Sequence, residues 1–321
     1  MGVLIIMNKT VCELFAGVGG FRCGLNHINS SPENQEEKWE TVWFNQWEPA
    51  EKTTQYAHDC YVYNFGKSLD IDGNETTNLN IEDVDKSKIP DFNLLVGGFP
   101  CQDYSVASTL HTSKGLEGKK GVLWWSIRDT IEEKKPPFVL LENVDRLIKS
   151  PAKQRGRDFG VMLTCLRDQG YNVEWRVINA AEYGYQQRRR RVFIFAYRND
   201  TNYSSKVVNN EVDLSLAKNI INKTGFFAST FRIKNINEED IKSITIPEEI
   251  GTVSSEFKFE FMNSGLMING VVYTVKIEPR YDGQYKTLGD ILETGEVDKS
   301  YFISNERLYY TDPSVKRSDE S

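Results

Sequence analysis

The chain has 321 residues, of which 39% are hydrophobic and 26% charged, and its formal net charge is −7. This composition excludes a disordered tail, a collagen and a coiled coil, and the length fits one large domain or a large domain with a smaller one. An acidic chain of this kind is typical of a metabolic enzyme rather than a nucleic-acid binder, although a local basic patch is independent of net charge.

No apolar run near the start of the chain reaches the length of a membrane span or of a signal-peptide core. We therefore expect the protein in the cytoplasm. The five cysteines include no CxxC pair and the three histidines lie far apart, so the sequence predicts neither a disulfide scaffold nor a metal site.

Short apolar runs alternate with longer helical patterns over the first 200 residues. Strands separated by helix-length stretches predict an α/β fold, with a mostly parallel sheet and helices on both faces. The predicted strands are Val11–Phe15, Thr41–Asn45, Leu94–Gly97, Phe138–Val144, Val173–Asn179 and Val192–Tyr197, and the predicted helices are Glu48–Phe65, Val122–Glu133 and Asp158–Gln169.

The amino-acid composition changes after Arg198, where Asn, Ser, Thr and Lys become frequent. We place a boundary there, with a first domain at residues 1–198 and a β-rich second region, the start of a smaller domain, at residues 199–321. Three later runs are predicted as strands: Phe257–Met262, Gly270–Ile277 and Tyr301–Ser304.

A glycine turn follows the first predicted strand and leads into a helix, within the run Glu13–Phe21. Such a turn lets a ligand approach the backbone and points a helix N-terminus at it. The glycine spacing is not GxGxxG, which argues against a dinucleotide as the ligand. The alternative is a strand-to-helix turn that binds no ligand.

A cysteine, Cys101, lies in the run Gly97-Gly98-Phe99-Pro100-Cys101-Gln102 at the end of the third predicted strand. Open α/β sheets bind ligands at this edge, so Cys101 is a candidate nucleophile, with buried filler as the alternative. The aperiodic stretch Gln102–Gly121 that follows is typical of a mobile active-site loop.

Two further motifs carry charged side chains at strand ends. Glu142-Asn143-Val144 closes the fourth predicted strand, and a run of four arginines, Arg188 to Arg191, precedes the sixth. In an extended segment Arg189 and Arg191 point to the same side, where they could offer two guanidinium groups to a base or a phosphate. A surface glutamate and a solvated basic turn are the alternatives.

With these four motifs in this order, the chain resembles the DNA (cytosine-5) methyltransferases, above all the bacterial enzymes of restriction-modification systems. The resemblance covers roughly residues 9–198, and Gly121-x-Leu123-Trp124-Trp125 is similar to a further family motif. It implies a Rossmann-like fold, S-adenosylmethionine as cofactor without a metal, and duplex DNA as partner in the bacterial nucleoid.

The resemblance also assigns roles. The thiolate of Cys101 adds to C6 of a cytosine flipped out of the duplex, Glu142 acts at N3, and Arg189 and Arg191 hold the base and its phosphate. Substrate contacts are assigned to Gln102, Ser105, Asn143 and Gln187. Cofactor contacts are assigned to Phe15, Ala16, Gly17, Gly19, Gly20, Gln46, Trp47, Asn80, Ile81, Pro100 and Leu123.

The chain departs from the family pattern at three places. Gln46 and Asn80 stand where acidic residues are usual, with Asp72 and Asp83 as alternative matches for the second position, and we expect cofactor binding to be weakened but retained. No closing Gly-Asn motif follows residue 200.

The missing motif has three possible explanations: a shortened chain, one half of a split enzyme, or a degenerate relative. In the first two cases a C-terminal segment or a second subunit would supply target recognition. The alternatives to a DNA methyltransferase are a tRNA cytosine-5 methyltransferase and a non-catalytic relative that binds DNA or a protein partner.

Overall fold

The computed structural model describes residues 8–27, 39–49, 54–99, 123–208 and 212–302. Within these ranges a nine-stranded sheet has the order β2-β1-β3-β4-β6-β5-β8-β9-β7. The strands are β1 (Thr10–Leu14), β2 (Glu40–Asn45), β3 (Leu94–Gly98), β4 (Phe138–Val144), β5 (Tyr171–Asn179), β6 (Arg190–Arg198), β7 (Lys242–Thr245), β8 (Ser264–Ile268) and β9 (Val271–Val275).

Strands β1 to β4 pair in parallel, and β6 is inserted antiparallel between β4 and β5. Strands β1 to β5 therefore all run in one direction, as predicted for the first domain. Strands β8, β9 and β7 extend the sheet by antiparallel pairing from β5. The boundary near Asn199 is not decided by this pairing and stays a prediction.

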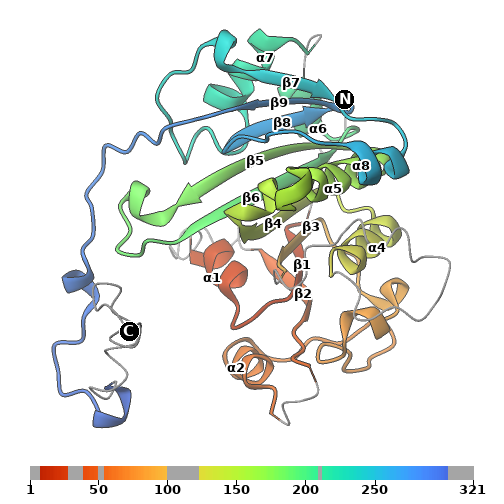
Figure 1. The fold of residues 1–321 in the computed structure, drawn as a ribbon. Helices are drawn as coiled ribbons and strands as arrows, with labels where there is room; N and C mark the ends of the chain where they lie inside the picture. The colour runs from red at the N-terminus through yellow and green to blue at the C-terminus, as the bar shows by residue number, and fades with distance from the viewer. Residues whose placement is uncertain (1–7, 28–38, 50–53, 100–122, 209–211, 303–321) are drawn as a thin grey trace, which may run out of the picture.

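Helices cover both faces of the sheet, as the predicted fold requires (Figure 1). In β4, Val139 and Leu141 pack into the cluster that includes α4, α5 and α8, whereas Leu140 faces the cluster of α1 on the other side. The helices are α1 (Gly20–His27), α2 (Tyr56–Phe65), α4 (Trp124–Lys134), α5 (Arg157–Asp168), α6 (Asn202–Val207), α7 (Leu214–Asn219) and α8 (Ile250–Glu256). None of the described helices is long and apolar enough to cross a membrane.

The predicted helix Glu48–Phe65 was wrong at its start. Helix α2 begins at Tyr56, and the Gln55 side chain instead accepts from the Glu48 N–H at 2.7 Å and donates to the Glu48 carbonyl at 2.8 Å. These two hydrogen bonds tie Gln55, the residue before the helix, to the backbone of Glu48.

The predicted strand Phe257–Met262 is not a strand. Phe257 and Phe261 are buried against the α5 face, so the alternating pattern does mark a buried side. Among the described strand pairs none includes this backbone, however, and the Phe259 N–H donates to the carbonyl of Arg155.

At the end of the described chain, residues Lys299–Tyr301 form a 3₁₀ turn rather than the start of a strand. Residues 303 and 304 of that predicted strand lie outside the described residues. Gly270–Ile277 is confirmed as a shorter strand, β9. Beyond β9 the chain leaves the sheet, as the blue segment in Figure 1 shows, with Leu288, Ile291 and Leu292 exposed.

Candidate active site and cofactor loop

The glycine turn between β1 and α1 is built from positive backbone angles. Phe15 has φ 54°, Gly17 has φ 56° and Gly19 has φ 92°. A side chain on Gly19 would collide with the Phe65 ring, so both backbone and packing require glycine here. Beside Gly17 and Gly20 the space is open, which leaves room for a ligand at the start of α1.

The end of β2 supports this turn. The Gly17 N–H donates to Gln46 Oε1 at 2.7 Å, and the Ala16 N–H donates to the Asn45 carbonyl at 3.0 Å. Gln46 therefore braces the turn through its acceptor oxygen, and Trp47, which is half-buried, follows directly.

The segment before the 3₁₀ turn η2 (Ile81–Asp83) lies beside the end of β2. Asn45 Nδ2 donates to the carbonyls of Thr77 and Leu79, and the Gln46 N–H donates to Thr77 as well. Asn80 caps η2 by accepting from the Glu82 N–H, and Ile81 is buried. The structure thus brings the segments of Phe15, Gln46 and Asn80 to one edge of the sheet.

Glu13 is a buried carboxyl just before the turn, and the sequence analysis gave it no role. Tyr61 donates its hydroxyl to Glu13 Oε2 at 2.9 Å, and the Arg22 guanidinium lies over the Tyr61 ring. Burial raises the pKa of Glu13 to about 7, and the hydrogen bond from Tyr61 opposes that rise. The sequence feature that could have identified Glu13 is an acidic residue next to the apolar residues of a predicted strand.

Glu142 is held by two arginines, Arg191 at the start of the neighbouring strand β6 and Arg189 just before it. Its Oε1 atom lies 2.9 Å from Arg191 Nε and 3.2 Å from Arg189 Nη2. The predicted common side of Arg189 and Arg191 is therefore confirmed. The other oxygen, Oε2, lies beside Gly98, where glycine leaves it uncovered by a side chain.

Asn143 faces the opposite way from Glu142. It is buried, and its Nδ2 donates to the carbonyl of Phe99 at 3.1 Å while its Oδ1 accepts from the Val144 N–H. Asn143 thus fixes the end of β3 against the end of β4. Because Asn143 directly follows Glu142, its bond to Phe99 fixes the residue before Pro100 relative to the Glu142 backbone.

The remaining predicted residues divide into two groups. Gln187 is exposed just before β6, and Leu123 caps α4 and packs against the main core. The nucleophile candidate and its neighbours lie outside the described residues: Pro100, Cys101, Gln102 and Ser105.

A sequence model of the family described as C-5 cytosine-specific DNA methylase matches residues 9–306 of the chain. The chain belongs to this family. The resemblance based on the four motifs is therefore confirmed, and the match extends well beyond residue 198.

Among curated methylases of this kind, the Type II methyltransferase M.Sau3AI of Staphylococcus aureus is 44% identical over 306 residues, covering 94% of this chain and 69% of that protein. The Type II methyltransferase M.HhaI of Haemophilus parahaemolyticus is 32% identical, covering 59% of this chain and 49% of that protein. The chain thus spans about half the length of relatives such as M.HhaI.

A crystal structure of the S. pombe Dnmt2 methyltransferase has a TM-score of 0.44 and 20% identity to this chain, covering 64% of this chain and 56% of that one. Among the residues described, no three His, Cys, Asp or Glu side chains could together hold a metal ion.

Proposed function

We propose that this chain transfers a methyl group from S-adenosylmethionine to C5 of a cytosine flipped out of duplex DNA. The observation that carries the proposal is the convergence of Arg189 and Arg191 on Glu142 Oε1, at the sheet edge that also holds the glycine turn. Ligands bind at this edge in open α/β sheets.

The glycine turn fits S-adenosylmethionine, because open space lies beside Gly17 and Gly20 and the turn leads into α1. Phe15, Gln46, Trp47, Asn80 and Ile81 would line that site. The bound cofactor supplies an electrophilic methyl group.

The side chains of the protein activate the cytosine. The thiolate of Cys101 adds to C6, which makes C5 nucleophilic enough to take the methyl group. A base, which can be a water molecule, then removes the C5 proton, and the C6–S bond breaks to release the thiolate. Glu142 shares a proton with N3 and so makes C6 more electrophilic. Because Oε1 is held by Arg189 and Arg191, we assign Oε2 as the atom that meets the base.

Arg189 also has the freedom to bind the substrate backbone. Half of its side chain is exposed, and the guanidinium group can bind a phosphate with the donors that Glu142 does not use. Asn143 positions the segment that carries Cys101, through its bond to Phe99.

The likeness to Type II methyltransferases leads us to place this activity in a restriction-modification system, in the bacterial cytoplasm at the nucleoid. A second subunit or a further segment of the protein would supply the recognition of the DNA sequence.

The test is methyl transfer from labelled S-adenosylmethionine to mixed-sequence duplex DNA and, separately, to tRNA. We expect label as 5-methylcytosine in the duplex alone, and none with the Cys101→Ser variant. Label in tRNA alone, or undiminished label with Cys101→Ser, would overturn the proposal. Duplex DNA with 5-fluorocytosine at the target should trap a covalent complex that survives denaturation.

A further inference from the structure

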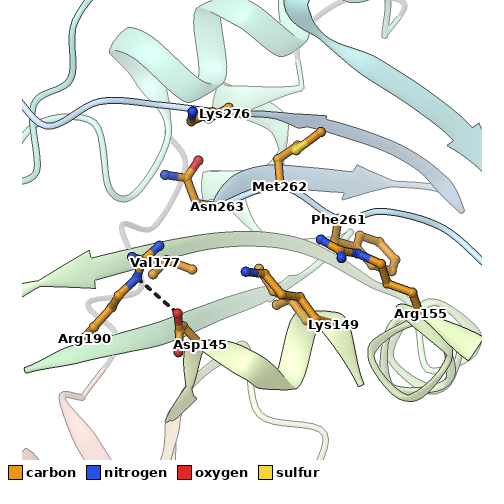
Figure 2. A pocket seen from close by; sticks show the side chains of 10 residues that line it. Asp145, Lys149, Arg155, Val177, Arg190, Phe261, Met262, Asn263 and Lys276 are labelled. Atoms are coloured by element: carbon orange, nitrogen blue, oxygen red, sulfur yellow. Dashed lines mark ion pairs between the residues drawn. The ribbon is translucent and has the colours of Figure 1, made fainter. Parts of the chain in front are cut away.

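A basic pocket of about 170 Å³ has Arg190 in its lining, the residue between Arg189 and Arg191 in the chain (Figure 2). Its walls come from the 3₁₀ turn η4 (Asp145–Lys149), the start of β6, the segment before β8 and the residue after β9. Its charged lining residues are Asp145, Lys149, Arg155, Arg190 and Lys276.

Two of the four cations in this pocket have a carboxylate partner. Arg190 Nε lies 3.1 Å from Asp145 Oδ2, and Arg155 Nη2 lies 3.0 Å from Glu260 Oε1. These ion pairs hold both guanidinium groups in place in the lining of the pocket.

The two lysines are different. Within the described part of the chain neither Lys149 nor Lys276 has an ion-pair partner, and both are exposed. Figure 2 shows them on opposite walls, one on η4 and the other after β9. Two unpaired ammonium groups that face a common space favour an anion between them.

Asn263, the uncharged polar residue of the lining, already makes hydrogen bonds within the protein. Asn263 Nδ2 donates to the Ile277 carbonyl and its Oδ1 accepts from the Ile277 N–H, at 2.9 and 2.7 Å. Asn263 therefore fixes the backbone next to Lys276 through its amide oxygen and one of its two amide N–H donors, while the four cations dominate the lining. A ligand here would be recognised by charge, which is how proteins bind the DNA backbone irrespective of sequence.

The position of the pocket suggests which anion it binds. Arg190 alternates with Arg189 and Arg191 along the chain, so it points away from Glu142, toward Asp145 and the pocket. A duplex whose target base reaches Glu142 carries further phosphates on either side of it.

We propose that Lys149 and Lys276 together bind a backbone phosphate of duplex DNA, at a site separate from Arg189 and Arg191. The proposal rests on the proposed function, because it takes duplex DNA as the substrate.

The test is the salt dependence of duplex binding. Binding of a 30-base-pair duplex is measured between about 50 and 200 mM salt for wild type and for Lys149→Gln/Lys276→Gln. Each phosphate contact adds roughly 0.9 to the magnitude of the slope of log affinity against log salt, so loss of this one phosphate site should lower that magnitude by about 1 in the double variant. Several unrelated duplexes should be weakened equally.

A matched control is Lys153→Gln/Lys258→Gln, which removes the same charge from two exposed lysines outside the pocket. Its slope should match wild type, and both variants should bind S-adenosylmethionine with wild-type affinity. An unchanged slope in the pocket variant, an equal fall in the control, or a loss confined to tRNA binding would overturn the phosphate site. If wild type still methylates duplex DNA in that case, the proposed function stands without it.

Discussion

Arg191 and Glu142 lie on neighbouring antiparallel strands, and Arg191 Nε is 2.9 Å from Glu142 Oε1. The register pairs Val144 with Arg191 and Glu142 with Phe193, so the arginine lies just beyond the carboxyl along the strand direction. The insertion of β6 beside β4 thus brings residues 49 positions apart into one ion pair.

Arg191→Lys should lower methyl transfer because lysine cannot keep the planar guanidinium contact with Glu142. A charge-assisted hydrogen bond contributes about 1.5–3 kcal/mol, so we expect the turnover rate to fall by roughly 10- to 100-fold. The rate is measured under single-turnover conditions at saturating duplex.

The control for this change is Arg188→Lys, at an exposed residue of the same arginine run. It should keep the wild-type turnover rate. Equal losses at Arg188 and Arg191 would show that guanidinium groups are needed throughout the arginine run, and would contradict a special role for the contact with Glu142.

Gly19→Ala should weaken cofactor binding. Its φ of 92° strains any side chain, and the Phe65 ring occupies the space that a Cβ needs. We expect the dissociation constant for S-adenosylmethionine to rise by at least about 10-fold, which corresponds to the 1–3 kcal/mol of a strained backbone residue. Isothermal titration calorimetry measures it.

Gly24→Ala provides the comparison, because Gly24 lies in α1 with open space around it. Alanine there should raise stability by about 0.5–1 kcal/mol and leave cofactor affinity unchanged. Unchanged affinity in Gly19→Ala would contradict the assignment of this turn as the cofactor loop.

Local sequence patterns predicted most of the parallel part of the fold. The apolar run of β3 is buried on both faces and that of β4 alternates buried with half-buried residues, so both are recognisable from their apolar composition. The side shared by Arg189 and Arg191 follows from the period of an extended chain in the same way.

Other features depend on contacts that local sequence does not encode. Phe257–Met262 has the alternation of a strand, but tertiary packing on α5 buries its aromatics without a ladder partner. The pairing of Arg190 with Asp145 depends on the antiparallel insertion of β6, which no local pattern predicts.

Tyr61→Phe should destabilise the protein, because Glu13 would lose the hydroxyl that donates to its buried carboxyl. An unsatisfied buried polar group costs about 1–3 kcal/mol, and we expect the free energy of unfolding in urea to fall by that amount. Tyr63→Phe, in the same helix but 90% exposed, should have no effect. Equal stability of the two variants would show that the Glu13 contact contributes nothing.

Glu174 makes the stability of the protein depend on pH. Its carboxyl is buried, accepts from the Tyr203 hydroxyl at 3.0 Å and from the Phe226 N–H at 2.9 Å, and burial raises its pKa to about 7. Between the ordinary value of 4.5 and about 7 the folded state binds a proton that the unfolded state has lost. The stabilisation is complete below that range and is lost as the pH rises through it.

Glu174→Gln removes this titration while keeping an amide that can serve both partners. The free energy of unfolding is measured by urea denaturation at several pH values from 4.5 to 8. For one proton, the decline per pH unit should become shallower in the variant by up to about 1.4 kcal/mol within the range below pH 7. The exposed Glu239→Gln should follow the wild-type curve. Parallel curves for wild type and Glu174→Gln would contradict this, because they would mean that the pKa of Glu174 is the same in the folded and unfolded protein and that its two hydrogen bonds offset its burial.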